Sequence, residues 1–299
     1  MTERMKILIG YDGSESAVSM LEDLKSAGLP NQAEVKVVSV GEVWLASPTE
    51  DDASPLFDRE TPKKLANEAC TRLKVIFPDW ELTPEGEVGS AAMQIIAVAD
   101  EWKPNLIILG SQGLSALGRF FFGSVSQKVV TEAHCSVHIG RGKAGRAAGA
   151  GVRLVVAFDG SEQSEAAVKT VASRNWPEGS EVILVTSIDL YAIDSTSHMP
   201  SSHAIGTNVI IPKASEQRHY AEQIQKKAEE ILKGTGLKVV SVIREEDPKK
   251  AIIDTAEKAG ADCIFVGSRG LGRIRRFLLG SVSSAIVTRA HCSVEIVRC

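Results

Sequence analysis

The sequence predicts an α/β protein made of two copies of one domain, each with a parallel sheet that helices cover on both faces. Short continuous apolar runs alternate with helical patterns along the chain, as expected for strands buried on both faces of a parallel sheet. The second half also repeats the first, because the same Asp-Gly-Ser sequence ends an apolar run at Asp12 and again at Asp159. A length of 299 residues suits two domains of ordinary size.

The spacing of the repeat locates an insertion in the second half. Asp12 and Asp159 are 147 residues apart, whereas the later pair Gly110 and Gly267 are 157 apart, so the second half carries ten extra residues. We expect them in the loop at residues 189–212. Residues 142–151 hold four glycines and no large apolar side chain, which is typical of a linker. The expected domains are therefore residues 1–141 and 152–299.

The first half is predicted to follow the order β-α-β-α-β-α-β-α-β. Start signals support two of its helices, because Ser14 follows a turn and Pro62 suits the first turn of a helix. The polar stretch between residues 42 and 60 is expected to be a long loop. Apolar runs predict strands at residues 5–11, 35–40, 106–109 and 136–139, and a weaker strand is expected at 82–88. Helical patterns predict helices at 14–27, 61–77, 90–102 and 125–132.

The second half repeats this order. Its first helix is expected after Asp159, by analogy with the helix after Asp12. Its strands are predicted at residues 152–158, 181–187, 239–243, 263–266 and 294–297, and its later helices at 219–233, 248–259 and 281–290.

Composition argues against several classes of protein. A net charge of −4 disfavours a general nucleic-acid binder or a protein that binds anionic membranes. The apolar runs are too short to span a bilayer, and the N-terminus leads directly into a strand without a signal peptide. The five cysteines include no CxxC pair, so we expect a reduced, cytoplasmic protein without a metal site.

A glycine-punctuated loop follows the fourth predicted strand of each half. Its glycines have the same spacing in both copies: Gly110, Gly113 and Gly123 followed by Ser124, and Gly267, Gly270 and Gly280 followed by Ser281. Glycine lets the backbone approach a ligand closely, and the N-terminus of the following helix presents unpaired N–H groups to an anion. Ser124 is expected to cap that helix. The pattern therefore predicts a phosphate cradle in each half.

These loops and the paired aspartates resemble the universal stress protein family over nearly the whole chain, as two tandem copies. The resemblance implies two adenine-nucleotide α-hydrolase-like, Rossmann-like domains, each with a five-stranded parallel open sheet of order 3-2-1-4-5. The family contains members that bind ATP and members that do not, and the complete glycine loop marks the ATP-binding type. Both copies here have it.

The resemblance also implies which residues bind the nucleotide. Asp12 and Asp159 correspond to the adenosine end of the family's site, and backbone groups of the second strand, which we align with Val40 and Ile188, would contact adenine. The remaining predicted contacts to ribose and phosphates are Leu109, Gly110, Gly113, Gly123, Ser124 and Val125 in the first copy, and Val266, Gly267, Arg269, Gly270, Gly280, Ser281 and Val282 in the second.

The two loops differ in charge. The second contains Arg269 and three further arginines, at positions 273, 275 and 276, whereas the first contains only Arg119 and has Gln112 in the place of Arg269. Cationic side chains strengthen phosphate contacts, so tighter binding is expected in the second half. Glu246, near the start of the third helix of that half, would act in the opposite direction.

The sequence predicts a binding and signalling module rather than an enzyme. It contains no nucleophile elbow, HExxH motif or Walker A lysine, and no general base can be named, so ATP hydrolysis is expected to be slow at most. Mg²⁺ is expected only together with a triphosphate. The open alternatives are a weak ATPase or nucleotidyl-transfer enzyme, and a ligand-free scaffold that binds proteins through residues 189–212.

The fifth strands predict how the two halves are arranged. Universal stress proteins usually dimerise by pairing these strands, so Ser136–Ile139 and Ser293–Val297 are expected to pair within one chain as an internal pseudo-dimer. A further homodimer of whole chains is also compatible with the sequence.

Overall fold

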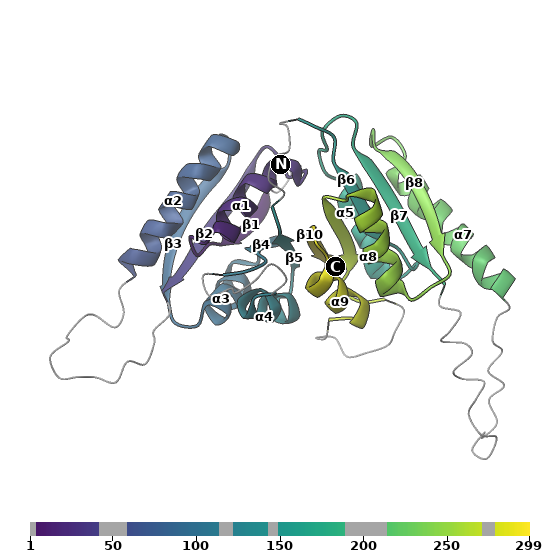
Figure 1. The fold of residues 1–299 in the computed structure, drawn as a ribbon. Helices are drawn as coiled ribbons and strands as arrows, with labels where there is room; N and C mark the ends of the chain where they lie inside the picture. The colour runs from purple at the N-terminus through teal and green to yellow at the C-terminus, as the bar shows by residue number, and fades with distance from the viewer. Residues whose placement is uncertain (1–3, 42–58, 114–121, 143–148, 189–213, 271–278) are drawn as a thin grey trace, which may run out of the picture.

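The structure is a computed structural model that describes residues 4–41, 59–113, 122–142, 149–188, 214–270 and 279–299. Each half alternates strands and helices along a twisted sheet (Figure 1). The first half contains β1 (Met5–Gly10), α1 (Glu15–Asp23), a 3-10 turn (Leu24–Ser26), β2 (Ala33–Gly41), α2 (Glu60–Ile76), β3 (Glu81–Val88), α3 (Ala91–Trp102), β4 (Leu106–Gly110), α4 (Ser124–Glu132) and β5 (Ser136–Gly140). The second contains β6 (Arg153–Ala157), α5 (Glu162–Ala172), β7 (Glu181–Ser187), α7 (Ala214–Leu232), β8 (Lys238–Arg244), α8 (Pro248–Ala259), β9 (Cys263–Gly267), α9 (Ser281–Arg289) and β10 (Ser293–Val297).

The strands form one ten-stranded sheet in the order β3-β2-β1-β4-β5-β10-β9-β6-β7-β8. Each half therefore has the predicted order 3-2-1-4-5, with its strands parallel. The two five-stranded sheets are continuous, because β5 pairs with β10 in antiparallel register, as expected from the sequence. This pairing removes two sheet edges that would otherwise be open to association.

The central strands are buried on both faces because helices cover both. In β1, Ile7 and Ile9 pack on the side of α1 and α2, while Leu8 packs on the side of α3 and α4, and all three side chains are fully buried. Burying a side chain of this size contributes about 1.5–3 kcal/mol relative to leaving it exposed. Successive residues of a strand point to opposite faces, so a continuous apolar run is what such a strand requires.

One hydrophobic cluster crosses the boundary between the halves. It combines side chains of α3 and α4 with side chains of α8 and α9, under the strand pair β5–β10. Ile139 and Val294 face each other in that pair and are both fully buried. The halves therefore share part of their core as well as their sheet.

The largest difference between the expected and the observed elements concerns the second helix of the second half. It was expected from His219, but α7 begins at Ala214. Residues 189–213, which include most of the ten-residue insertion that the repeat predicts, lie outside the described residues. Among the described residues, no helix is long and apolar enough to cross a membrane.

Candidate functional site

The aspartate after β1 lies against the glycine loop after β4. Asp12 uses one carboxylate oxygen to accept a hydrogen bond from the Ser14 N–H, at 3.0 Å. Its other oxygen would lie 3.0 Å from a Cβ atom placed on Gly113. A side chain at Gly113 would thus crowd the carboxylate. These two residues, which are about one hundred positions apart in the sequence, come together at the carboxyl ends of neighbouring parallel strands, where open α/β sheets bind ligands.

The second half repeats this contact more tightly. Asp159 accepts a hydrogen bond from the Ser161 N–H at 3.0 Å. A Cβ atom on Gly270 would lie only 2.5 Å from the other Asp159 oxygen. Both aspartates are half-buried turn residues, while Ser14 and Ser161 are the residues that cap the following helices. In each copy, one carboxylate oxygen is therefore held by the turn and the other faces the loop.

The helices that follow the loops begin without a side-chain cap. Gly123 and Gly280 occupy the N-cap positions of α4 and α9, and no side-chain hydrogen bond closes either helix end. The expectation that Ser124 caps the helix is wrong, because Ser124 and Ser281 are instead the first residues of the helices. The first N–H groups of a helix have no partner within it, so these ends offer donors and a positive dipole to an anion.

Hydrogen bonds close each loop on the end of its strand. The Gly123 N–H donates to the Ser111 carbonyl at 2.9 Å, and the Ser126 hydroxyl donates to the Gly110 carbonyl at 2.7 Å. The second copy has the equivalent bonds from Gly280 to Ser268, at 2.8 Å, and from Ser283 to Gly267, at 2.7 Å. Sequence reasoning missed the two buried serines, although the repeated Gly-Ser-Val-Ser sequence could have indicated them.

Close packing also requires the glycine at the end of the fourth strand. A Cβ atom on Gly267 would lie 2.7–2.9 Å from atoms of Gln163, two of them backbone atoms. At Gly110 the nearest atom would be the Ser16 hydroxyl oxygen, at 3.2 Å. The first helix of each half therefore approaches the loop closely, and more closely in the second half.

The second strands show a register that differs from the predicted alignment. The Val38 carbonyl accepts from Tyr11, and the Val185 carbonyl accepts from Phe158, both at 2.9 Å. Val38 and Val185 are therefore equivalent, and the counterpart of Val40 is Ser187 rather than Ile188.

The direction of the backbone groups follows from this register. Backbone groups alternate between the two neighbouring strands, so those of Val40 and Ser187 point to the side where β1 and β6 have ended. The Ile188 N–H instead donates to the Arg244 carbonyl at 2.7 Å. Alignment of Ile188 with Val40 was therefore wrong by one residue.

The apolar residues predicted at the site support its walls. Leu109 and Val266 are buried at the ends of β4 and β9. Val125 and Val282 are half-buried in the first turns of α4 and α9 and pack against the shared core. Their side chains face the protein interior, so only their backbone groups can serve a ligand at the loop.

The charged residues near the second loop are partly described. Arg269 is half-buried next to Ser268, whose N–H donates to the Val297 carbonyl at 2.8 Å. Burial lowers the pKa of Arg298, and the positive charge of Arg269 lowers it further. Arg119, Arg273, Arg275 and Arg276 lie outside the described residues.

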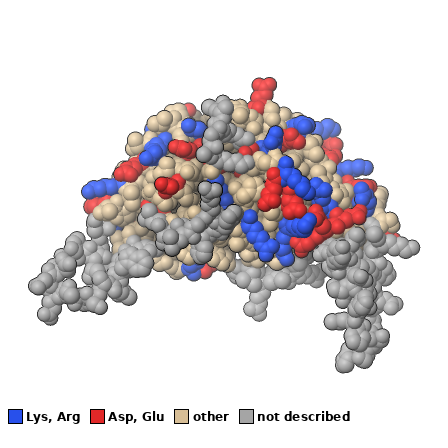
Figure 2. Space-filling model, viewed as in Figure 1, with Lys and Arg blue, Asp and Glu red and all other residues tan. Residues whose placement is uncertain are grey.

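Glu246, which was expected to weaken anion binding, has a cationic partner. Its carboxylate lies 2.6 Å from the Lys250 ammonium, which also contacts Asp254 at 2.9 Å. Figure 2 shows acidic and basic side chains interleaved on the face in view, rather than separated into large areas of one sign. The pairing with Lys250 reduces the repulsion that Glu246 would exert on a bound phosphate.

Burial affects the acidity of two cysteines. Burial raises the pKa values of the Cys70 and Cys135 thiols to about 11, so both stay protonated at neutral pH. Cys292 is buried, as expected for a small core residue. Among the described residues, no group of three side chains could hold a metal ion.

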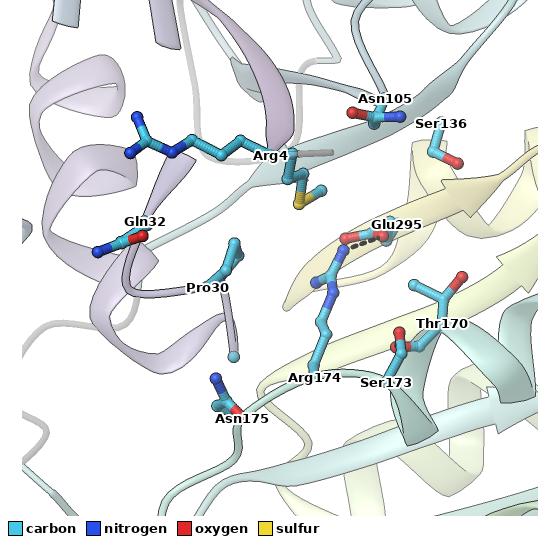
Figure 3. Close-up of a pocket in the computed structure, with 12 residues that line it drawn as sticks. Arg4, Pro30, Gln32, Asn105, Ser136, Thr170, Ser173, Arg174, Asn175 and Glu295 are labelled. Carbon is cyan, nitrogen blue, oxygen red and sulfur yellow. Dashed lines mark hydrogen bonds and ion pairs between the residues drawn. The ribbon is translucent and has the colours of Figure 1, made fainter. Parts of the chain in front are cut away.

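A separate pocket of about 550 Å³ lies between the halves (Figure 3). Met5, Asn105 and Ser136 line it from the amino ends of β1, β4 and β5, and Arg174 and Glu295 line it from the second half. Ligands of open α/β sheets bind at the opposite, carboxyl ends of strands. The pocket is therefore distinct from the glycine loops.

Comparison with known proteins gives a consistent result over the whole chain. The model of the universal stress protein family matches residues 3–141 and 152–298. A relative from Staphylococcus epidermidis that carries the universal stress protein name is 34% identical over 150 residues, which are 48% of this chain and 82% of the relative. A Staphylococcus aureus relative of the same name is 32% identical over 150 residues, which are again 48% of this chain and 82% of the relative. The crystal structure of a universal stress protein from Archaeoglobus fulgidus covers 98% of both chains with a TM-score of 0.66 at 22% identity, a similarity of fold.

Proposed function

The chain belongs to the universal stress protein family, and from this premise we propose that it binds one adenine nucleotide, ATP, at each of its two glycine loops. One observation carries the proposal: in both halves, an uncapped helix N-terminus and an aspartate oxygen face the same loop. The first supplies donors for phosphate and the second supplies an acceptor for a hydroxyl group. A nucleotide carries both kinds of group, on its phosphates and on its ribose.

The described residues fit such a ligand. The first N–H groups of α4 and α9, at Ser124 and Ser281, would bind the phosphates. Asp12 and Asp159 would accept hydrogen bonds from ribose hydroxyl groups, away from the phosphates. Backbone groups of Val40, and by the observed register those of Ser187, would contact adenine.

The family context suggests a nucleotide-dependent module in a stress response. Its two sites would be held as an internal pseudo-dimer by the β5–β10 pair. We place it in a reducing compartment, the cytoplasm, because none of its five cysteines is in a disulfide. Mg²⁺ would accompany the triphosphate rather than occupy a protein cage. A further homodimer of whole chains stays a prediction.

Isothermal titration of the full-length protein tests this function. ATP should bind at both sites, and inorganic tripolyphosphate, which lacks ribose and adenine, should bind much more weakly. Asp12→Ala combined with Asp159→Ala should weaken ATP binding but leave tripolyphosphate binding unchanged or stronger, because a negative charge near the anion is lost. Equal affinity for ATP and tripolyphosphate would contradict the assignment of the adenosine end.

A further inference from the structure

The strand pair between the halves has an approximate twofold axis through one residue pair. In the antiparallel register Val137 faces Ile296, His138 faces Glu295, and Ile139 faces Val294. His138 and Glu295 are also equivalent in the sequence repeat, 157 positions apart. If two identical halves paired in this register, the central residue of each would face its own copy. Two first halves would oppose two histidines, and two second halves would oppose two glutamates.

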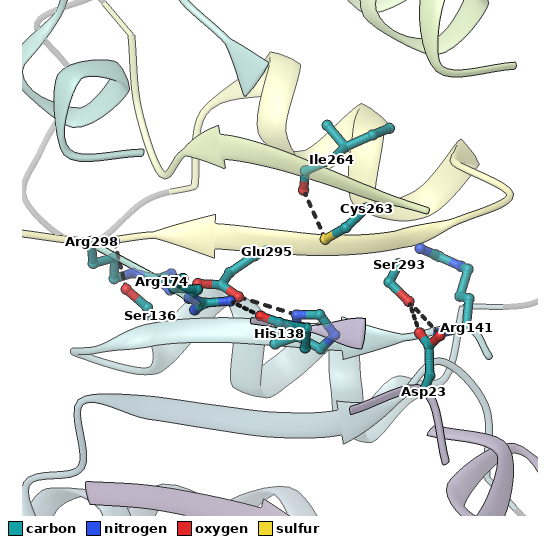
Figure 4. Close-up of polar contacts among 11 residues, drawn as sticks. Asp23, Ser136, His138, Arg141, Arg174, Cys263, Ile264, Ser293, Glu295 and Arg298 are labelled. Atoms are coloured by element: carbon teal, nitrogen blue, oxygen red, sulfur yellow. Dashed lines mark hydrogen bonds and ion pairs between the residues drawn. The ribbon is translucent and has the colours of Figure 1, made fainter. Parts of the chain in front are cut away.

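The central pair is buried and lies within hydrogen-bond distance (Figure 4). The exposed fractions of the His138 and Glu295 side chains are 3% and 0%, and the His138 Nδ1 atom lies 3.1 Å from a Glu295 carboxylate oxygen. The other oxygen of Glu295 accepts a hydrogen bond from the Arg174 guanidinium group. Two facing Glu295 side chains would bury two carboxylates next to each other, each with the Arg174 of its own half as its cationic partner, and the repulsion between the carboxylates would disfavour this pair.

Arg174 also lies at the boundary between the halves. It follows α5 of the second half and donates to the Ala27 carbonyl of the first half at 3.0 Å. Figure 3 shows it extending from that loop toward Glu295. Ala27 is the repeat equivalent of Arg174, 147 positions earlier. Two second halves would therefore bring two buried arginines together, and two first halves would have none.

A steric contact also disfavours the pairing of two second halves. The Trp176 ring of the second half packs over Gly28 of the first, so closely that a Cβ atom on Gly28 would lie 2.9 Å from two ring atoms. The repeat equivalent of Gly28 is Asn175. Pairing of two second halves would place an asparagine side chain where the ring now needs a glycine.

Two arginine contacts across the boundary do not discriminate between like and unlike halves. The Arg141 guanidinium donates to the Cys292 carbonyl at 3.1 Å, and its repeat equivalent Arg298 donates to the Cys135 carbonyl at 3.2 Å. Each arginine also donates to a carbonyl of the other half's last helix, at Val287 and Val130 respectively. Because both halves contribute the same residue to the same contact, this pair would form equally well between identical halves.

We propose that the boundary between the halves is a selective surface whose only fitting partner is the other half of this chain, or of a second copy, and that the His138–Glu295–Arg174 group and the Trp176–Gly28 contact reject identical halves. Arg141 and Arg298 strengthen the pair without selecting it. Specificity of this kind depends on unfavourable contacts in the wrong pair as much as on favourable ones in the right pair. As a consequence, each assembled pair of halves always contains one glycine loop of the first-half type and one of the second-half type.

The test uses the full-length chain with a protease cleavage site introduced between residues 143 and 148. After folding and cleavage, the protein is unfolded in urea, refolded and examined by native mass spectrometry. The amount of the unlike pair, one first half with one second half, should exceed the amount of each like pair, two first halves or two second halves, by at least about tenfold. Random association would give a factor of about two. Pairs in statistical proportion would overturn the proposal.

A second variant changes the selective residues of the second half to their first-half equivalents, as Glu295→His, Arg174→Ala, Asn175→Gly and Trp176→Leu. Like pairs of second halves should then appear after cleavage, and the uncleaved variant should show a higher mass than the unsubstituted chain in light scattering. Arg298→Ala is the matched control, which should weaken pairing without changing which halves pair. If the fourfold variant still formed only pairs of one first half with one second half, these four residues would not be the ones that select the pairing.

Discussion

At the scale of single residues, the two copies of the loop share their hydrogen bonds but differ in space and charge. A Cβ atom on Gly267 would lie within 2.9 Å of backbone atoms of Gln163, whereas the nearest atom to one on Gly110 would be the Ser16 hydroxyl oxygen, at 3.2 Å. Arg269 stands where the first copy has Gln112. The repeated glycines could be predicted from the sequence, but the difference in packing could not, because it depends on how closely α1 and α5 approach the sheet.

The difference in packing predicts that a glycine-to-alanine substitution destabilises the protein more at Gly267 than at Gly110. Gly267→Ala should lower the free energy of unfolding by about 1–3 kcal/mol, because the helix backbone must move to admit a methyl group. Gly110→Ala should cost less, since the Ser16 side chain can rotate away. Urea denaturation followed by circular dichroism measures both, and an equal loss in the two variants would show that the close approach at Gly267 is absent.

The difference in charge predicts unequal affinities. Arg269→Gln should weaken ATP binding at the second site by about tenfold, or about 1.4 kcal/mol, because a charge-assisted contact to phosphate is lost. Gln112→Arg is the reciprocal variant and should strengthen the first site. Titration calorimetry resolves the two classes of site, and an unchanged second-site affinity in Arg269→Gln would remove the arginine from the binding site.

At the scale of elements, the strands followed from continuous apolar runs, and the starts of most helices followed from Ser, Pro and Asp signals. The boundaries that could not be predicted depend on contacts between elements. Ser124 resembles a cap, but the closure of the loop on Ser111 places Gly123 in that position. Likewise, Ile188 could be separated from Ser187 only by the register of β7 against β6 and β8.

Two buried serines are predicted to hold the anion-binding helices in place. Ser126→Ala and Ser283→Ala should each lower the free energy of unfolding by about 1 kcal/mol, because the hydroxyl bond to the Gly110 or Gly267 carbonyl is lost. Each should also weaken ATP binding at its own site only. Differential scanning calorimetry with and without ATP measures both effects, and exposed Ser124→Ala provides a nearby control for stability. A variant that weakened the opposite site would contradict this assignment.

At the scale of the whole molecule, the halves form one sheet with one shared core cluster, and a buried carboxylate lies near their pseudo-twofold axis. Burial alone would raise the pKa of Glu295, but the Arg174 guanidinium and the His138 ring together hold it below its ordinary value. Pairing of the fifth strands could be expected from the sequence. The role of Glu295 could not, because its partners come from the loop after α5 and from β5, far away in the chain.

The lowered pKa of Glu295 predicts how stability depends on pH. A carboxyl group whose pKa is lower in the folded than in the unfolded state stabilises the fold above its unfolded value, and this stabilisation is lost as the pH falls through the folded value. The free energy of unfolding should therefore fall below the ordinary pKa of 4.5 more steeply in the unsubstituted protein than in Glu295→Gln, by at most about 1.4 kcal/mol per pH unit. Urea titrations between neutral and acid pH measure the slopes. Parallel slopes would show that folding does not lower the pKa of Glu295.

The most direct test of the account is the number of ATP molecules that one chain binds, measured by native mass spectrometry of the full-length protein. Two bound ATP molecules are expected at saturation. One should remain in either Gly113→Val or Gly270→Val, and none in the double variant, because each valine crowds the aspartate that faces its loop. Absence of ATP binding by the unsubstituted chain, or two bound molecules in the double variant, would contradict the assignment of the glycine loops as nucleotide sites.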